Sequence, residues 1–166
     1  IAYNRISTEF RTWKRYQGGM APCIWMGSLE SGDFQKITDW VGTNNWPMWA
    51  ADGIYFTSDR EGGTLNICKY DTGSKQTTVL THYKDYDVKY PSMGPGAIVY
   101  QYGESLHVFD LATGKSRKIE VNIPTDLVKM RPWYVDATKD QGTFGLSPSG
   151  ARLLLEARGE ILNIAV

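Results

Sequence analysis

The sequence contains no apolar run of the roughly 18 residues that a membrane-spanning helix requires, and its beginning lacks the basic and then apolar pattern of a signal peptide. It also lacks an excess of charge, because 18 Lys and Arg residues balance 18 Asp and Glu residues. A chain without net charge creates no overall field that attracts a polyanion or an anionic lipid surface. These absences argue against nucleic acid and membranes as partners.

Cysteine and histidine are scarce, with two residues of each. Neither Cys23 nor Cys68 has Cys-x-x-Cys or Cys/His ligand spacing around it, so we expect buried free thiols, with a disulfide or a metal site as the alternative. His82 and His107 are far apart in the sequence and offer no metal-ligand spacing. We therefore expect no cofactor.

Catalytic motifs are missing as well. Residues 145–149, GLSPS, begin like a nucleophile elbow, but Ser149 stands where that motif requires a second glycine. The acidic and basic residues are scattered, and we expect Asp59, Arg60 and Glu61 to form a turn with a local ion pair of little energetic weight.

Aromatic residues, at 13% of the chain, and 17 glycines are abundant, and this composition favours short strands joined by tight turns over long helices. Residues 45–83 and 89–121 repeat one another element by element. A repeat period of a few tens of residues is typical of propellers and solenoids. The matching pieces are Pro47 with Pro91, Gly53–Phe56 with Ala97–Tyr100, and Leu65–Asp71 with Leu106–Asp110.

Two incomplete copies, residues 1–38 and 143–166, each supply three further strands. We therefore predict an all-β fold, a β-propeller fragment of about three to four blades over residues 1–166 in which each blade is a four-stranded antiparallel sheet. A blade cannot bury both of its faces alone, so neighbouring blades must stack face to face. We expect tryptophan rings to fill the wedge between blades rather than to stack on a ligand, namely those of Trp25, Trp46 and Trp49.

Two insertions, residues 7–22 and 122–141, interrupt the repeat. Insertions in repeat proteins leave the scaffold at its surface and often bind partners. Their cationic and aromatic side chains could hold a peptide carboxylate; alternatively, each cation lies on a neighbouring ring by cation–π contact. The residues concerned are Trp13, Lys14, Arg15 and Tyr16 in the first insertion, and Lys129, Arg131, Trp133 and Tyr134 in the second.

The two histidines are expected to differ in their surroundings. His107 lies in the strand-like run LHVFD, where an outward position is expected. His82 lies in the loop THYKDYD between two repeats, and we expect it to face one end of the propeller. His82 is therefore the better candidate for a functional residue, with an ordinary solvated loop histidine as the alternative.

The stretches TWKRYQGGMAPCIWM followed by SGDFQKIT, IYFTSDREGGTLNICKYD, and SPSGARLLLEARGEILNI resemble the six-bladed N-terminal propeller of the tricorn protease family. The blade repeat also resembles those of TolB and of prolyl-oligopeptidase-type propellers. The tricorn resemblance implies a segment of a large serine peptidase that trims oligopeptides, in which propellers act as gates or channels. The family's catalytic Ser and His lie in a region that no residue of this chain matches, so we expect the fragment itself to be inactive.

The resemblance also bears on partners and compartment. It implies oligopeptides and other domains of the parent peptidase as partners, and it favours the cytoplasm. Both ends of the sequence look cut from a longer chain, so export stays open, and we expect self-association through open blade edges and faces. The alternatives are a stand-alone TolB-like interaction module without activity and a propeller enzyme with a site in its central channel.

Overall fold

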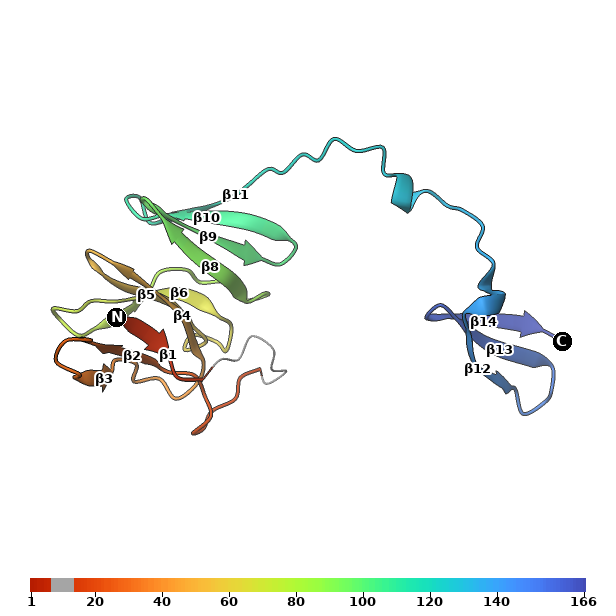
Figure 1. Cartoon of the computed structure of the whole chain (residues 1–166), viewed down its shortest axis with the longest axis horizontal. Coiled ribbons are helices and arrows are strands. Elements are labelled where there is room, and N and C mark those ends of the chain that lie inside the picture. The colour runs from red at the N-terminus through yellow and green to blue at the C-terminus, as the bar shows by residue number, and fades with distance from the viewer. Residues whose placement is uncertain (7–13) are drawn as a thin grey trace. The chain divides into compact units, whose positions relative to one another are not determined.

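The structure is a computed structural model that describes residues 1–6 and 14–166 (Figure 1). It divides into two compact units, residues 1–121 and residues 122–166, which are described separately. Helical structure in the described residues is confined to two short 3-10 turns, η1 (Val128–Met130) and η2 (Ala137–Lys139). No helix in those residues has the length and apolarity needed to cross a membrane.

In the described residues all strand pairing is antiparallel, and it forms sheets of three, four, four and three strands along the chain. The all-β prediction and its strand count are therefore confirmed. The sheets are β1 (Ala2–Asn4), β2 (Ile24–Gly27) and β3 (Phe34–Lys36); β4 (Asn44–Ala50), β5 (Gly53–Ser58), β6 (Asn66–Tyr70) and β7 (Thr77–Val79); β8 (Val88–Gly94), β9 (Ala97–Tyr102), β10 (Ser105–Asp110) and β11 (Lys115–Lys118); and β12 (Gln141–Leu146), β13 (Arg152–Ala157) and β14 (Glu160–Ala165).

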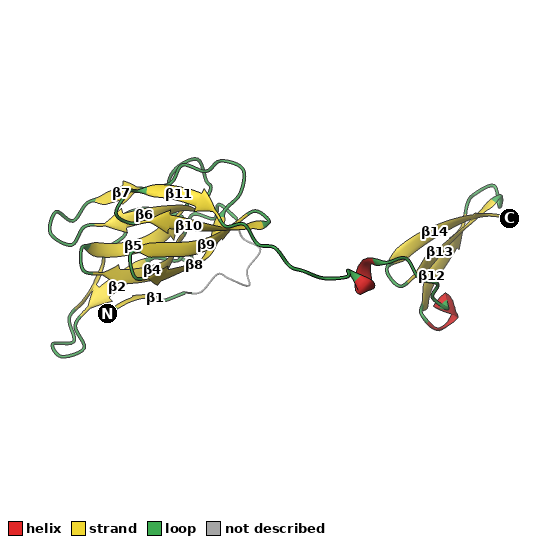
Figure 2. Cartoon of the chain, turned by 90° about the horizontal axis from the view of Figure 1, so that it is seen from above, coloured by secondary structure: helices red, strands yellow, loops and turns green. Residues whose placement is uncertain are grey.

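The second sheet is packed on both of its faces, because it lies between the first and the third sheet; Figure 1 shows the three sheets one above another, and Figure 2 shows the same unit from above. Strand β5 is buried at every position, which explains its continuous apolar sequence. Side chains alternate between the faces of a strand. Ile54 and Phe56 accordingly pack with Ile24 of the first sheet, whereas Tyr55 packs with Ile98 of the third.

Buried asparagines hold the connections between sheets. The Asn66 side chain is fully buried, and its Nδ2 donates to the carbonyl oxygens of Thr64 at 3.2 Å and Tyr83 at 3.0 Å. Its Oδ1 accepts from the Tyr83 amide at 2.7 Å and from Thr81 Oγ1 at 2.9 Å. Asn44, on β4 of the same sheet, contacts the connection from the first sheet, where its Nδ2 donates to three backbone carbonyls. One amide thus satisfies several backbone groups that have no strand partner.

The prediction that tryptophan rings fill the wedge between sheets is wrong. Trp49 is 51% exposed and Trp46 is half-buried, whereas the interior is made of Ile, Tyr, Phe and Val side chains. Trp46 has φ 51° and Tyr90 has φ 50°, and each directly precedes a proline at a bulge of the first strand of its sheet. The bulge redirects the ring away from the interior, and the two rings lie 5.9 Å apart.

The cysteines are free thiols, as predicted. Cys68 is fully buried, and this burial raises the pKa of its thiol to about 12. Cys23 is only half-buried, and its Sγ accepts from Trp25 Nε1 at 3.3 Å. The Cys68 thiol is therefore uncharged at neutral pH and contributes as a small apolar side chain.

Candidate functional site

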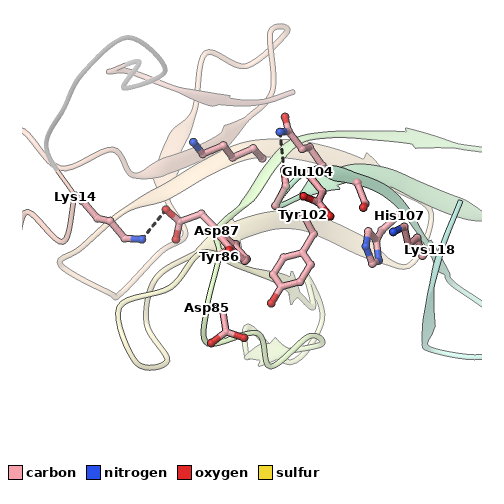
Figure 3. Close-up of a pocket in the computed structure, with 12 residues that line it drawn as sticks. Lys14, Asp85, Tyr86, Asp87, Tyr102, Glu104, His107 and Lys118 are labelled. Atoms are coloured by element: carbon pink, nitrogen blue, oxygen red, sulfur yellow. Dashed lines mark hydrogen bonds and ion pairs between the residues drawn. The ribbon is translucent and has the colours of Figure 1, made fainter. Parts of the chain in front are cut away.

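A groove of about 640 Å³ lies around the turn between β9 and β10 and the connection that enters β8 (Figure 3). It belongs entirely to the first unit. Its charged and aromatic lining residues are Lys14, Asp85, Tyr86, Asp87, Lys89, Tyr102, Glu104, His107 and Lys118.

The connection that carries Asp85, Tyr86 and Asp87 is held firmly against the preceding sheet. The backbone amide of Leu65 donates to Asp87 Oδ1 at 2.9 Å, and Thr64 Oγ1 donates to the Lys84 carbonyl at 3.2 Å. The second carboxylate oxygen of Asp87 pairs with Lys14 Nζ at 3.0 Å. Asp87 therefore holds this wall of the groove in place, and Lys14 neutralises its charge.

The second wall is aromatic and is rigidified by ring contacts. Tyr102 stacks on Tyr83 with centroids 3.9 Å apart, and it meets the edges of Tyr86 at 5.8 Å and His107 at 5.5 Å. The Tyr83 and Tyr100 hydroxyls are 2.8 Å apart, and Tyr100 donates to a serine hydroxyl of β11 at 2.8 Å. These contacts fix the Tyr102 ring in one orientation.

Gly103 makes the turn that forms the rim of the groove. Its φ of 58° lies in the left-handed region, which favours glycine. A Cβ at this position would also meet the Tyr86 ring at 3.3 Å. Glycine thus allows the β9–β10 turn to approach the Tyr86 ring closely.

The surroundings of Tyr102 and His107 favour the uncharged form of both rings. Burial, and then the charge of Asp85, raise the pKa of Tyr102. Burial, and then the charge of Lys118, lower the pKa of His107 from its ordinary value of 6.5. The remaining charges have both signs, and Asp85 and Lys118 have no ion-pair partner among the described residues. The arrangement can therefore bind a ligand that carries both charges, and neutral ring groups are available for hydrogen bonding.

The sequence suggested an outward-facing position for His107, and this prediction is wrong. Its ring lies 5.7 Å from that of Tyr100 and is half-buried among tyrosines. In the register of the third sheet it pairs with Tyr100 on β9 and Lys118 on β11. The LHVFD run did not show which of its alternate positions faces the neighbouring sheet.

The described part of the first insertion, from residue 14 on, is attached to the scaffold rather than freely presented. Trp13 lies outside the described residues. Lys14 pairs with Asp87, and Arg15 Nε donates to the Gly63 carbonyl at 3.3 Å, so both cations contact the second sheet or its connection to the third. Tyr16 is half-buried. A peptide-carboxylate role for these side chains stays a prediction.

His82 is exposed and beside the turn that follows β5. Its Nδ1 lies 2.8 Å from Glu61 Oε2, and the pair borders a small pocket of about 220 Å³. Glu61 therefore does not join the local ion pair that the sequence suggested. Arg60 pairs instead with Asp39 at 3.4 Å, because the side chains of this turn point toward neighbouring loops.

In the second unit, Arg131 and Trp133 line one pocket of about 450 Å³ together with Arg158 and Glu160. Lys129 lies in η1 and does not line this pocket. The predicted Arg131 and Trp133 thus share a pocket. Whether they bind a peptide stays a prediction.

No group of three or more His, Cys, Asp or Glu side chains suited to a metal ion occurs in residues 1–6 and 14–166. The groove residues Asp85, Tyr86, Tyr102, Glu104 and Lys118 were not singled out from the sequence. The signal that could have found them is the stretch YKDYD, where acidic and tyrosine residues crowd into one connection between repeats.

Comparison with known proteins decides the family. Residues 1–115 match the model described as the tricorn protease N-terminal beta propeller domain. The chain belongs to this family. It is 28% identical over 153 residues to a tricorn protease homolog of Saccharolobus solfataricus, which covers 92% of this chain and 14% of that protein. It is 31% identical over 117 residues to the tricorn protease of Thermoplasma acidophilum, covering 70% of this chain and 11% of that protein.

Solved structures agree with the family assignment. The crystal structure of the tricorn protease matches 98% of this chain and 15% of its own chain, with a TM-score of 0.70 and 26% identity. TolB from Acinetobacter baumannii matches 99% of this chain and 37% of its own, with a TM-score of 0.55 and 18% identity, which shows a shared fold alone. The chain is therefore a propeller segment that spans a small part of the length of its family relatives.

Proposed function

We propose that this chain is a non-catalytic propeller segment of a tricorn-like serine peptidase, and that it acts as a scaffold or as a gate or channel for oligopeptide substrates. The family match over residues 1–115 is the observation that carries the proposal. Blade limits at residues 1–38, 45–83, 89–121 and 143–166, with an insertion at 122–141, are part of the same proposal.

The environments of the histidines support a non-catalytic role. In the described residues, His82 bonds to Glu61 and His107 packs against tyrosine rings, so neither is paired with a serine or cysteine nucleophile. Nucleophilic catalysis requires such a base within hydrogen-bond reach of the nucleophile. The groove instead offers fixed aromatic rings and charges of both signs, which suit passage or transient binding of peptides.

The test compares the 166-residue chain with the longer protein that contains it on a set of fluorogenic oligopeptides. The chain alone is expected to give only background hydrolysis, and the longer protein is expected to cleave. Hydrolysis by the chain alone that disappears when His82 or His107 is replaced by Gln would overturn the non-catalytic assignment. The alternative is a stand-alone TolB-like interaction module, and absence of hydrolysis by the longer protein would favour it.

Self-association through uncovered sheet faces is a second part of the proposal. The strand register places Phe144, Leu146 and Ile164 on one face of the terminal sheet, and they are 74%, 67% and 45% exposed. Val99 and Leu106, on the third sheet, are 40% and 45% exposed. Uncovered apolar faces of this kind mark interaction surfaces.

Light scattering on the purified chain is expected to give a mass above that of one copy, and Phe144→Ser is expected to lower it. A Thr125→Ser variant, changed at an exposed position of the insertion, serves as the matched control. A stable monomer at all concentrations would contradict the self-association.

A further inference from the structure

Two charges of the groove, those of Asp85 and Lys118, lie beside different rings of the aromatic wall. Lys118 is the register partner of His107 across β10 and β11. The Tyr102 and His107 rings are in edge contact at 5.5 Å, and the charge of Asp85 contributes to the raised pKa of Tyr102. Figure 3 shows Asp85 on the side toward which the Tyr102 ring points, and Lys118 beside His107. A carboxylate and an ammonium group thus flank a continuous surface of two rings.

Both of these charged groups are available to a ligand. Asp85 and Lys118, like Lys89 and Glu104, are exposed and form no ion pair in the described part of the chain, in contrast to Lys14 and Asp87, which neutralise one another at 3.0 Å. The rings between them are held by Tyr83, which stacks on Tyr102 at 3.9 Å. The recognition surface is consequently assembled before any ligand binds, which reduces the entropy lost on binding.

The balance of charge limits the class of ligand. The lining contains three lysines and three acidic residues, so an anion or a cation of several charges would meet as much repulsion as attraction. A small ligand with one positive and one negative end meets attraction at both ends. A peptide with free termini has this charge pattern.

We propose that the groove between the connection 80–87 and the β9–β10 turn binds a short peptide by both of its free termini, with the ammonium group at Asp85 and the carboxylate at Lys118. This rests on the proposed function, since it names the class of oligopeptide that the propeller segment would hold. His107 donates a hydrogen bond from its neutral ring to the peptide carboxylate. Tyr102 and Tyr86 contact the middle side chain of the peptide.

The experiment is an NMR titration of the 166-residue chain with a tripeptide that has a central leucine and free ends. The ring signals of His107 are expected to move, whereas those of His82, which borders a different pocket, are expected to stay. Because one exposed charge pair contributes at most about fivefold in affinity, acetylating the peptide or amidating it is expected to weaken binding about threefold to fivefold each.

Variants assign the two ends of the peptide. For Asp85→Asn, acetylating the peptide is expected to have no further effect on affinity, whereas amidating it still weakens binding. For Lys118→Gln, amidation is expected to have no further effect on affinity, whereas acetylation still weakens binding. Lys115→Gln on the same strand β11 and Asp126→Asn in the insertion are the matched controls, because neither side chain lines the groove. Thermal unfolding of each variant verifies that the fold is intact.

The proposal is overturned if His107 does not respond, if blocked and free peptides bind equally, or if either variant weakens binding of all peptides alike. The readout is separate from hydrolysis. Peptide binding by the chain together with no cleavage by the longer protein would refute the peptidase assignment and leave this site standing. Cleavage by the longer protein without binding here would refute this site alone.

Discussion

Replacing Phe56 with alanine is expected to lower the free energy of unfolding of the first unit by about 4 kcal/mol, the largest effect of any single truncation considered. Phe56 is fully buried, and it packs with Ile24 of the first sheet as well as with Ile54 and Tyr70 of its own. Truncation removes the apolar contact and leaves a cavity between two sheets that cannot collapse, because backbone hydrogen bonds hold both of them. Urea denaturation followed by tryptophan fluorescence measures the change.

The controls for this variant use the same surroundings. Phe56→Leu keeps most of the volume and is expected to cost about 1 kcal/mol. Leu29→Ala, in a turn of the first sheet where the side chain is 74% exposed, is expected to change stability by less than about 0.5 kcal/mol. If Phe56→Ala were no more destabilising than Leu29→Ala, sheet-on-sheet packing would not be the source of stability.

The Asn66→Ala variant is expected to lose about 3 kcal/mol of stability. The substitution removes four hydrogen bonds and leaves the backbone amide and carbonyl of Tyr83 without partners in a partly buried place. An unpaired buried backbone group costs more than the net value of the hydrogen bond that it has lost. Denaturant unfolding measures the total loss.

Asn66→Ala is also expected to act on the groove, because Tyr83 carries the stacked ring of Tyr102. Amide hydrogen exchange should increase in residues 80–87 before it increases in β5. The Asn122→Ala variant, changed at an exposed position, should leave both measurements unaltered. If amide exchange in residues 80–87 did not increase ahead of that in β5 for Asn66→Ala, the side-chain amide of Asn66 would not be what holds the connection 80–87.

The sequence predicted the sheets because the determinants of each strand are local. Ile54–Phe56 and Ala97–Tyr100 are short apolar runs bounded by glycine turns, and they form β5 and β9. The Asp-led turns were also visible, since Asp71 Oδ1 accepts from the Gly73 and Ser74 amides and Asp110 Oδ1 accepts from Thr113. The left-handed residue is Lys75, with φ 59°, in the first of these turns and Gly114, with φ 65°, in the second.

The groove was much less predictable because it depends on contacts between sheets. Whether His107 points outward depends on the register of three strands, and the sequence of a single strand does not determine that register. The Lys14 and Asp87 pair joins an insertion of the first repeat to the start of the third. Nothing in either local sequence indicates that these two residues meet.

The bulges at Trp46 and Tyr90 have a consequence for how copies of this chain can meet. Strands β4 and β8 are each the outermost strand on one side of their sheet, and outermost strands can recruit foreign chains through unpaired backbone groups. Here each carries a proline, Pro47 or Pro91, that has no N–H to offer, next to a residue whose backbone departs from an extended course. Pairing of a second copy along the β4 or β8 margin is thereby disfavoured, which leaves the opposite outer strands β7 and β11 and the uncovered sheet faces as the surfaces through which copies can associate.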